Sequence, residues 1–417
     1  MTSETLTWVV AAATTAAVIL RPFHWPEAIW AVAGAIVLIA LHLLSPQEAL
    51  AGVSRGTDVY LFLVGMMLLS ETAREAGLFD WMAAHATRRA NGSATRLFLL
   101  IYGVGTLVTI FLSNDATAVV LTPAVAAAAR TAKVKHPLPY LLTCAFVANA
   151  ASFVLPISNP ANLVIYGSRM PSLLQWLPLY AAASVASIVV TYLMLRWTQR
   201  ASLRQSVATD VPQPRLSQGG RYAAAGIAAT AAALLAVSAC DQPLGLPTAL
   251  LGITTAAVVL FVERRKPWQT LRGISWSVLP LVAGLFVVVE ALAKTGAIAL
   301  LASGLEAEAA RSTASASWAA GIAVAVASNL MNNLPVGLIA GSAVQAAHVP
   351  EPLFRAVLIG VDLGPNLSVS GSLATILWLA ALRREGHRVS AVRFLALGCL
   401  VMPPALGLAL AAAWLFG

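Results

Sequence analysis

The sequence predicts an all-α polytopic membrane protein with two inverted-topology repeats, whose broken or re-entrant helices meet near the bilayer midplane. Of its 417 residues, 59% are hydrophobic and only 10% are charged, whereas about 25% are charged in ordinary soluble domains. In addition, two segments of the chain repeat each other at a spacing of 219 positions. Such internal doubling is typical of secondary transporters.

The repeat relates DVYLFLVGMMLLSETAREAGLF, which starts at position 58, to SVLPLVAGLFVVVEALAKTGAI, which starts at position 277. Three pairs of residues match at the spacing of 219: Gly65 with Gly284, Glu71 with Glu290, and Gly77 with Gly296. If each repeat has an odd number of crossings, the two halves of the chain have opposite orientations in the membrane.

Apolar runs of about 17 to 25 residues, the length that crosses the hydrocarbon core, occur throughout the chain. The clear runs are residues 5–20, 28–44, 97–112, 177–197, 222–240, 246–262 and 394–416. Others, broken by Gly, Pro, Asn or Asp, lie around 58–73, 139–157, 277–293, 317–341 and 353–382. We expect about ten to twelve membrane-crossing elements, in a multi-pass protein of a bacterial-type inner membrane, surrounded by the lipid bilayer.

The net charge of +9 comes from the connections between these runs. Basic residues cluster at 196–221, 264–272 and 383–393, whereas the turn DQPLGLP, which starts at position 241, has none. Because basic loops stay on the cytoplasmic side, we expect these three clusters inside and the 241 turn outside. An excess of basic residues in the connections between spans indicates membrane topology, so we expect no nucleic-acid partner.

The pattern divides the chain into six segments. They are an N-terminal helical hairpin (1–50), a first repeat (51–176), a connecting helix and cytoplasmic linker (177–221), a second helical hairpin (222–273), a second repeat (274–390) and a C-terminal helix (391–417). After Gly77 and Gly296 each repeat has an amphipathic stretch, expected to be a helix at the membrane surface. For the second stretch a plain loop is the alternative.

Each repeat contains a polar break, FLSNDATAVVLTP in the first and SNLMNNLPVG in the second. Ser, Asn and Asp are N-cap residues, whose side chains bind the open backbone N–H groups where a helix restarts. Such a break must line an enclosed or watery cavity, because lipid cannot satisfy the open amides. We expect substrate at Ser113, Asn114, Asn329, Asn332 and Asn333. The alternative is that these residues only hydrogen-bond between helices.

A second pair of breaks aligns without a gap, NAASFVLPISNPAN from position 149 with DLGPNLSVSGSLAT from position 362. Proline, glycine and small polar residues produce unwound backbone that can coordinate a polar solute. The expected substrate-binding residues here are Asn149, Ser158, Asn159, Asn162, Ser372 and Thr375.

Asp115 and Asp362 are the acids of these broken segments. An acid at membrane depth is by default a functional candidate and often carries protons, so both are expected to serve in proton coupling. A structural cap, or an ion pair with Arg130 or Arg355, is the alternative. Glu71 and Glu290 are weaker candidates, because each lies close to a helix end.

The remaining side chains suggest no other chemistry. The three cysteines, at positions 144, 240 and 399, match no metal-ligand spacing, and we expect neither a metal site nor a cofactor. Two membrane acids would also suit an intramembrane aspartyl protease, but VDLGP lacks its GxGD-type signature, so we expect no enzyme. A channel stays an alternative, although inverted repeats and lone acids favour a coupled carrier.

The motifs SNDATAVVLTP, SNLMNNLPVG and GVDLGPNLSVSGSLATILWLAALRREG resemble those of the arsenite/antimonite efflux permeases of the ion transporter superfamily. The resemblance covers nearly the whole chain, apart from a short, Arg-rich central linker. It implies export of arsenite and antimonite in exchange for protons. Some family members work with a soluble ATPase subunit, and that partner stays open here. The alternative function is proton- or sodium-coupled transport of another small anion, such as a dicarboxylate.

Overall fold

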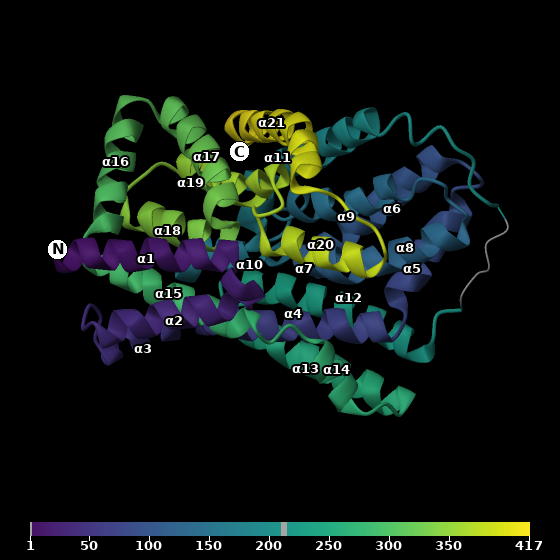
Figure 1. The fold of residues 1–417 in the computed structure, drawn as a ribbon, viewed down its shortest axis with the longest axis horizontal. Coiled ribbons are helices and arrows are strands. Elements are labelled where there is room, and N and C mark those ends of the chain that lie inside the picture. The colour runs from purple at the N-terminus through teal and green to yellow at the C-terminus, as the bar shows by residue number, and fades with distance from the viewer. Residues whose placement is uncertain (1, 210–214) are drawn as a thin grey trace.

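The computed structural model describes residues 2–209 and 215–417, and in these ranges the chain is helical and forms no β-strand (Figure 1). Residues 210–214 of the expected cytoplasmic linker lie outside the described residues. Seven of the described helices are long and apolar enough to cross a membrane, or up to nine if two bent helix pairs each count as one span. The shorter apolar helices Glu27–Ala40 and Leu138–Ala150 are further candidates, so the expectation of about ten to twelve membrane-crossing elements stays a prediction.

The two halves of the chain repeat one order of elements. The first half contains α1 (Ser3–Leu20), η1 (Pro22–His24), α2 (Glu27–Ala40), α3 (Pro46–Arg55), α4 (Thr57–Glu75), α5 (Leu78–Arg89), α6 (Ala94–Phe111), α7 (Asn114–Ala116), η2 (Thr117–Leu121), α8 (Thr122–Thr131), α9 (Leu138–Ala150), η3 (Pro156–Ser158), α10 (Pro160–Tyr166), η4 (Gly167–Arg169) and α11 (Leu173–Thr198).

The second half contains α12 (Gln218–Ala239), α13 (Gly245–Glu263), α14 (Pro267–Gly273), α15 (Val278–Lys294), α16 (Ala297–Arg311), α17 (Thr313–Met331), α18 (Asn333–Ala346), α19 (Glu351–Leu363), η5 (Gly364–Leu367), α20 (Leu373–Arg384) and α21 (Ala391–Phe416). Both amphipathic stretches are helices, α5 and α16. The glycines that precede them, Gly77 and Gly296, have φ of 76° and 80°, a conformation that favours glycine.

The repeated helices α4 and α15 each pack against the hairpin of the other half, α4 on α13 and α15 on α2. Glycine permits both contacts. A Cβ on Gly65 would lie 2.2 Å from the carbonyl oxygen of Thr248, and one on Gly284 would lie 2.6 Å from the carbonyl carbon of Ala31. The glycine pair of the sequence repeat therefore marks two equivalent close helix contacts that join the halves.

The segment from α6 to α8 is a re-entrant hairpin, because it starts and ends at the same end of the molecule. The N–H of Val207 donates to the carbonyl of Gly92, just before α6, at 3.1 Å. The next residue, Ala208, donates to the carbonyl of Ala132, just after α8, at 2.9 Å. The tip at Ser113 thus points into the protein and does not continue across it.

The segment α17–α18 is the second re-entrant hairpin. The N–H of His348, just after α18, donates to Glu306 Oε1 at 2.8 Å, and Glu306 lies near the end of α16, where α17 begins. Figure 1 shows α8 and α16 at opposite ends of the molecule, so the two hairpins enter from opposite ends. This arrangement confirms the predicted inverted repeats and shows that the first break of each repeat is the tip of a re-entrant hairpin.

Two broken helices cross between the hairpins, α9–η3–α10 in the first half and α19–η5–α20 in the second. They are tied to each other and to the hairpin tips by hydrogen bonds. Ser158 Oγ donates to the carbonyl of Ile110 near the first tip at 3.1 Å. At the second tip, the N–H of Asn333 donates to the carbonyl of Gly371 at 2.8 Å. Each tip therefore rests on the break of its own repeat.

Candidate solute site

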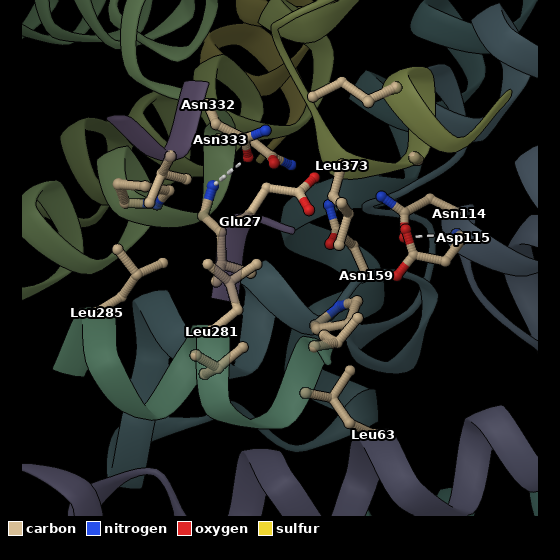
Figure 2. Close-up of a pocket in the computed structure, with 18 residues that line it drawn as sticks. Glu27, Leu63, Asn114, Asp115, Asn159, Leu281, Leu285, Asn332, Asn333 and Leu373 are labelled. Atoms are coloured by element: carbon tan, nitrogen blue, oxygen red, sulfur yellow. Dashed lines mark hydrogen bonds between the residues drawn. The ribbon is translucent and has the colours of Figure 1, made fainter. Parts of the chain in front are cut away.

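Four helices, α7, α10, α18 and α20, begin at one small cavity in the middle of the protein (Figure 2). This central cavity has a volume of 30 Å³, more than the roughly 10–15 Å³ that one buried water molecule needs. Its amide and aspartate lining consists of Asn114, Asp115, Asn159, Asn332 and Asn333. Because helix N-termini carry partial positive charge and point N–H groups outward, the cavity favours solutes with exposed oxygen atoms.

Side chains at the breaks cap these helix starts, as the sequence predicted for the first break. Ser113 Oγ accepts the N–H of Ala116 at 3.2 Å. Asn332 Oδ1 accepts the N–H of Leu334 at 3.3 Å. The other two starts are capped in the same way, by Asn159 at α10 and Ser372 at α20. The breaks therefore satisfy the open amides internally, which a helix end at membrane depth requires.

Asp362 lies one hydrogen bond behind the central cavity. Asn159, which lines the cavity, donates its Nδ2–H to Asp362 Oδ1 at 2.7 Å. The carboxyl group is fully buried, and its Oδ2 has no hydrogen-bond partner among the described residues. Asp115, in contrast, lines the cavity directly. The two acids assigned to proton coupling thus lie at different depths of one site.

Asn149 belongs to a buried network behind the cavity. Its Nδ2 donates to Asn366 Oδ1 at 3.0 Å and to Thr375 Oγ1 at 3.3 Å. Thr375 in turn shares a 2.9 Å hydrogen bond with Ser372. The network joins the two broken helices, and none of these four residues lines the central cavity.

The other predicted site residues lie around the breaks and outside the cavity lining. Asn162 Nδ2 donates to the carbonyl of Ser152 at 2.9 Å and so closes the loop of the first break. Asn329 Nδ2 donates to the carbonyl of Gly364 at 2.9 Å, which attaches α17 to η5. Ser158 contacts the first hairpin, as described above. In this structure these three residues hold the breaks in shape.

Among the described residues, neither Asp115 nor Asp362 forms the alternative ion pair with Arg130 or Arg355. Arg130 pairs with Glu385 at 2.6 Å, and the Nε and Nη1 atoms of buried Arg355 have no hydrogen-bond partner among the described residues. Glu71 pairs with Arg74, whose Nε–H donates to Glu71 Oε2 at 2.8 Å. Cys144 is buried and does not line the central cavity.

The opposite wall of the central cavity is apolar except for one acid. Its side chains come from the repeated helices α4 and α15: Leu63, Val278, Leu281, Val282 and Leu285. The acid is Glu27, at the start of α2. Sequence reasoning missed this residue, because an acid in the first turn of a helix is an ordinary dipole partner. The available signal was its position as a lone acid at the start of the apolar run 28–44.

Two further cavities flank the central one. A large cavity of 630 Å³ is lined by the ends of α10 and α18 and by the 241 turn, and it contains Glu290. A small cavity of 70 Å³ lies beside the returning arm of the first hairpin and contains Glu71 and Asp115. The two repeat-related glutamates therefore lie in different cavities, one on each side of the central site.

A family model described as CitMHS, Citrate transporter, matches residues 11–360 of the chain. This chain belongs to the CitMHS family. It is 28% identical over 374 residues to the "Arsenical pump membrane protein" of Yersinia enterocolitica, with 84% of each chain covered. It is 26% identical over 362 residues to the protein of the same name from Escherichia coli (strain K12), again with 84% of each covered.

Two solved structures share the fold of this CitMHS-family chain. The Alcanivorax borkumensis YdaH transporter superposes with a TM-score of 0.56 at 17% identity, covering 88% of this chain and 86% of that one. Neisseria gonorrhoeae MtrF superposes with a TM-score of 0.55 at 14% identity, covering 92% and 85%. The family model and the two relatives named above confirm the predicted resemblance to arsenical pump permeases. Together with the apolar helices of the described chain, they also confirm a multi-pass transporter of the bacterial inner membrane, not an enzyme.

Proposed function

We propose that this CitMHS-family permease exports trivalent arsenic, as arsenite, and antimonite across the inner membrane in exchange for protons. The central cavity carries the proposal. At neutral pH trivalent arsenic is largely an uncharged hydroxide, so its hydroxyl groups suit the amides of Asn114, Asn332 and Asn333 together with the four helix starts around them. The similarity to proteins named "Arsenical pump membrane protein" over 84% of the chain supports the same solute.

A described cavity lining without thiolate ligands suits a pump. Transport requires binding that is weak enough to release the solute, and three thiolates would hold trivalent arsenic tightly. None of the described residues that line the central cavity is a cysteine. Amides and backbone N–H groups supply weaker, reversible hydrogen bonds instead.

Asp115 and Asp362 supply the proton sites in this proposal. Asp115 faces the solute position, so solute and proton can compete there. The Oδ2 atom of Asp362 has no partner among the described residues and can take up a proton. Because Asp362 Oδ1 accepts from Asn159, a change in the protonation of Asp362 alters the hydrogen bonding of a residue that lines the cavity. Carboxyl groups enclosed at membrane depth are the usual proton carriers of such transporters.

The second candidate is a proton- or sodium-coupled carrier of another small anion, which the family description, Citrate transporter, favours. An anion site at membrane depth needs cationic side chains to offset desolvation. None of the described residues that line the central cavity is Arg or Lys. This chemistry favours the uncharged hydroxide over a dicarboxylate.

Uptake of arsenite into everted vesicles with an imposed proton gradient tests the proposal. We expect accumulation above that of vesicles without the protein, and its loss when a protonophore is added. Without added ATP, such uptake would also show that no ATPase subunit is required. Accumulation that survives the protonophore, or none above the empty vesicles, would contradict proton-coupled export. Asp115→Asn should abolish the coupled uptake, and undiminished uptake would remove Asp115 from the coupling role.

A further inference from the structure

The tip of the N-terminal hairpin reaches the central cavity. Glu27 of α2 and Val18 of α1 line it together with residues of the broken helices. Figure 2 shows the Glu27 side chain extending toward the space between Asn333 and Asn159. Since the rest of that wall is leucine and valine, Glu27 is the charged group that this side of the cavity presents to a solute.

Arg21 is the ion-pair partner of Glu27. Its Nη2 forms an ion pair with Glu27 Oε1, while the guanidinium is not among the described groups that line the cavity. The Glu27 carboxylate therefore faces the cavity, and the Arg21 guanidinium lies behind it. An anion that enters meets the negative end first, and like charges close together repel strongly away from bulk water.

The backbone of the hairpin tip has an unusual conformation. Arg21, Phe23 and His24 have φ of 46°, 59° and 60°, the left-handed region that residues other than glycine rarely adopt. Such strained residues persist only where the surroundings determine them, and they cluster at functional sites. Here they close the short turn between α1 and α2, from which Arg21 reaches Glu27.

We propose that the Arg21–Glu27 pair is a charge filter of the solute site, which excludes small anions and admits uncharged solutes. This proposal rests on the proposed function for its solute, but it makes a claim about anion binding that is measured without transport. Glu27 contributes the repulsion, and Arg21 acts as a positioning residue that holds the carboxylate at the cavity.

Exchanging the pair, in Arg21→Glu with Glu27→Arg, tests the filter. The exchange keeps the ion pair and the net charge but turns the base toward the cavity. A matched control exchanges the exposed pair of α16, in Glu308→Arg with Arg311→Glu. The readout is the melting temperature of the purified full chain with and without malonate, a small dianion.

We expect malonate to raise the melting temperature of the exchanged variant by about 2 °C or more, because a ligand that binds only the folded state stabilises it. The wild type and the α16 control should not respond. No response in the exchanged variant, or an equal response in the wild type, would overturn the filter. If the exchanged variant does not fold, Glu27→Gln, which leaves Arg21 unpaired beside the cavity, should show a smaller rise, and no rise would overturn the filter too.

The outcome separates the filter from the proposed function. If the wild type takes up no arsenite, but malonate raises the melting temperature of the exchanged variant and not that of the wild type, arsenic export alone is overturned. Conversely, a wild type that transports arsenite and also binds malonate would overturn the filter alone.

Discussion

Asn159 and Asp362 form a 2.7 Å hydrogen bond across 203 positions of the chain, and this bond ties the break of the first repeat to the broken helix of the second. One partner lines the central cavity and the other is fully buried behind it. The bond therefore connects the solute position to the enclosed acid. A change in the protonation of Asp362 changes what Asn159 can bind, since a protonated oxygen is a poorer acceptor.

Asp362→Asn should uncouple the transporter. Asparagine has nearly the same shape and keeps an oxygen that can accept from Asn159, but it cannot exchange a proton. We expect proton-driven arsenite uptake to be lost while exchange of labelled for unlabelled arsenite persists, both measured in everted vesicles. The control Asp80→Asn removes an exposed acid of α5 and should behave as wild type. Loss of both uptake and exchange would instead indicate that Asp362 serves solute binding.

Asn159→Ala should lower the free energy of unfolding. The variant leaves a buried Asp362 oxygen without its donor, and a buried acceptor left unsatisfied costs about 1–3 kcal/mol. Denaturant titration of the purified protein measures this change. Asn333→Ala is the matched control, because its amide lines the same cavity and has no side-chain hydrogen bond among the described residues. We expect Asn333→Ala to weaken arsenite uptake and leave stability near wild type.

The sequence predicted the repeat, the breaks and the N-caps, because none of the three requires knowing which distant residues are in contact. A cap acts within three residues, as between Ser113 and Ala116, and a repeat is visible by comparing the chain with itself. The re-entrant course of the hairpins was left open. An apolar run of 18 residues, such as α6, has the same composition whether it crosses the membrane or turns back.

The contacts that assemble the site could not be predicted in the same way. The partners Asn149 and Asn366 are 217 positions apart, and no local periodicity encodes such a pairing. Glu27 was overlooked for the same reason, since its role depends on a hairpin tip that packs beside helices far along the chain. The polar residue types identified the breaks in the sequence. They did not distinguish residues that line the cavity from residues such as Asn162, which closes a loop.

Gly65→Ala should destabilise the protein strongly. Its added Cβ would lie 2.2 Å from the backbone oxygen of Thr248, which cannot rotate away, and overpacking of this kind costs about 1–3 kcal/mol. Gly103→Ala is the control, because a Cβ there meets nothing within 4 Å. In a helix that change stabilises by about 0.5–1 kcal/mol. Thermal unfolding of both variants measures the difference, and equal melting temperatures would contradict the close contact of α4 with α13.

The large cavity should open to the outside of the cell, because the 241 turn that lines it has no basic residue. Cysteine labelling tests this orientation in a variant whose three native cysteines are replaced. Ser342→Cys places a thiol in the large cavity, and Ser275→Cys places one beside the small cavity. A membrane-impermeant maleimide added to right-side-out vesicles should label Ser342→Cys and spare Ser275→Cys. Everted vesicles should reverse the pattern. The opposite result would invert the topology and, with it, the direction of the proposed export.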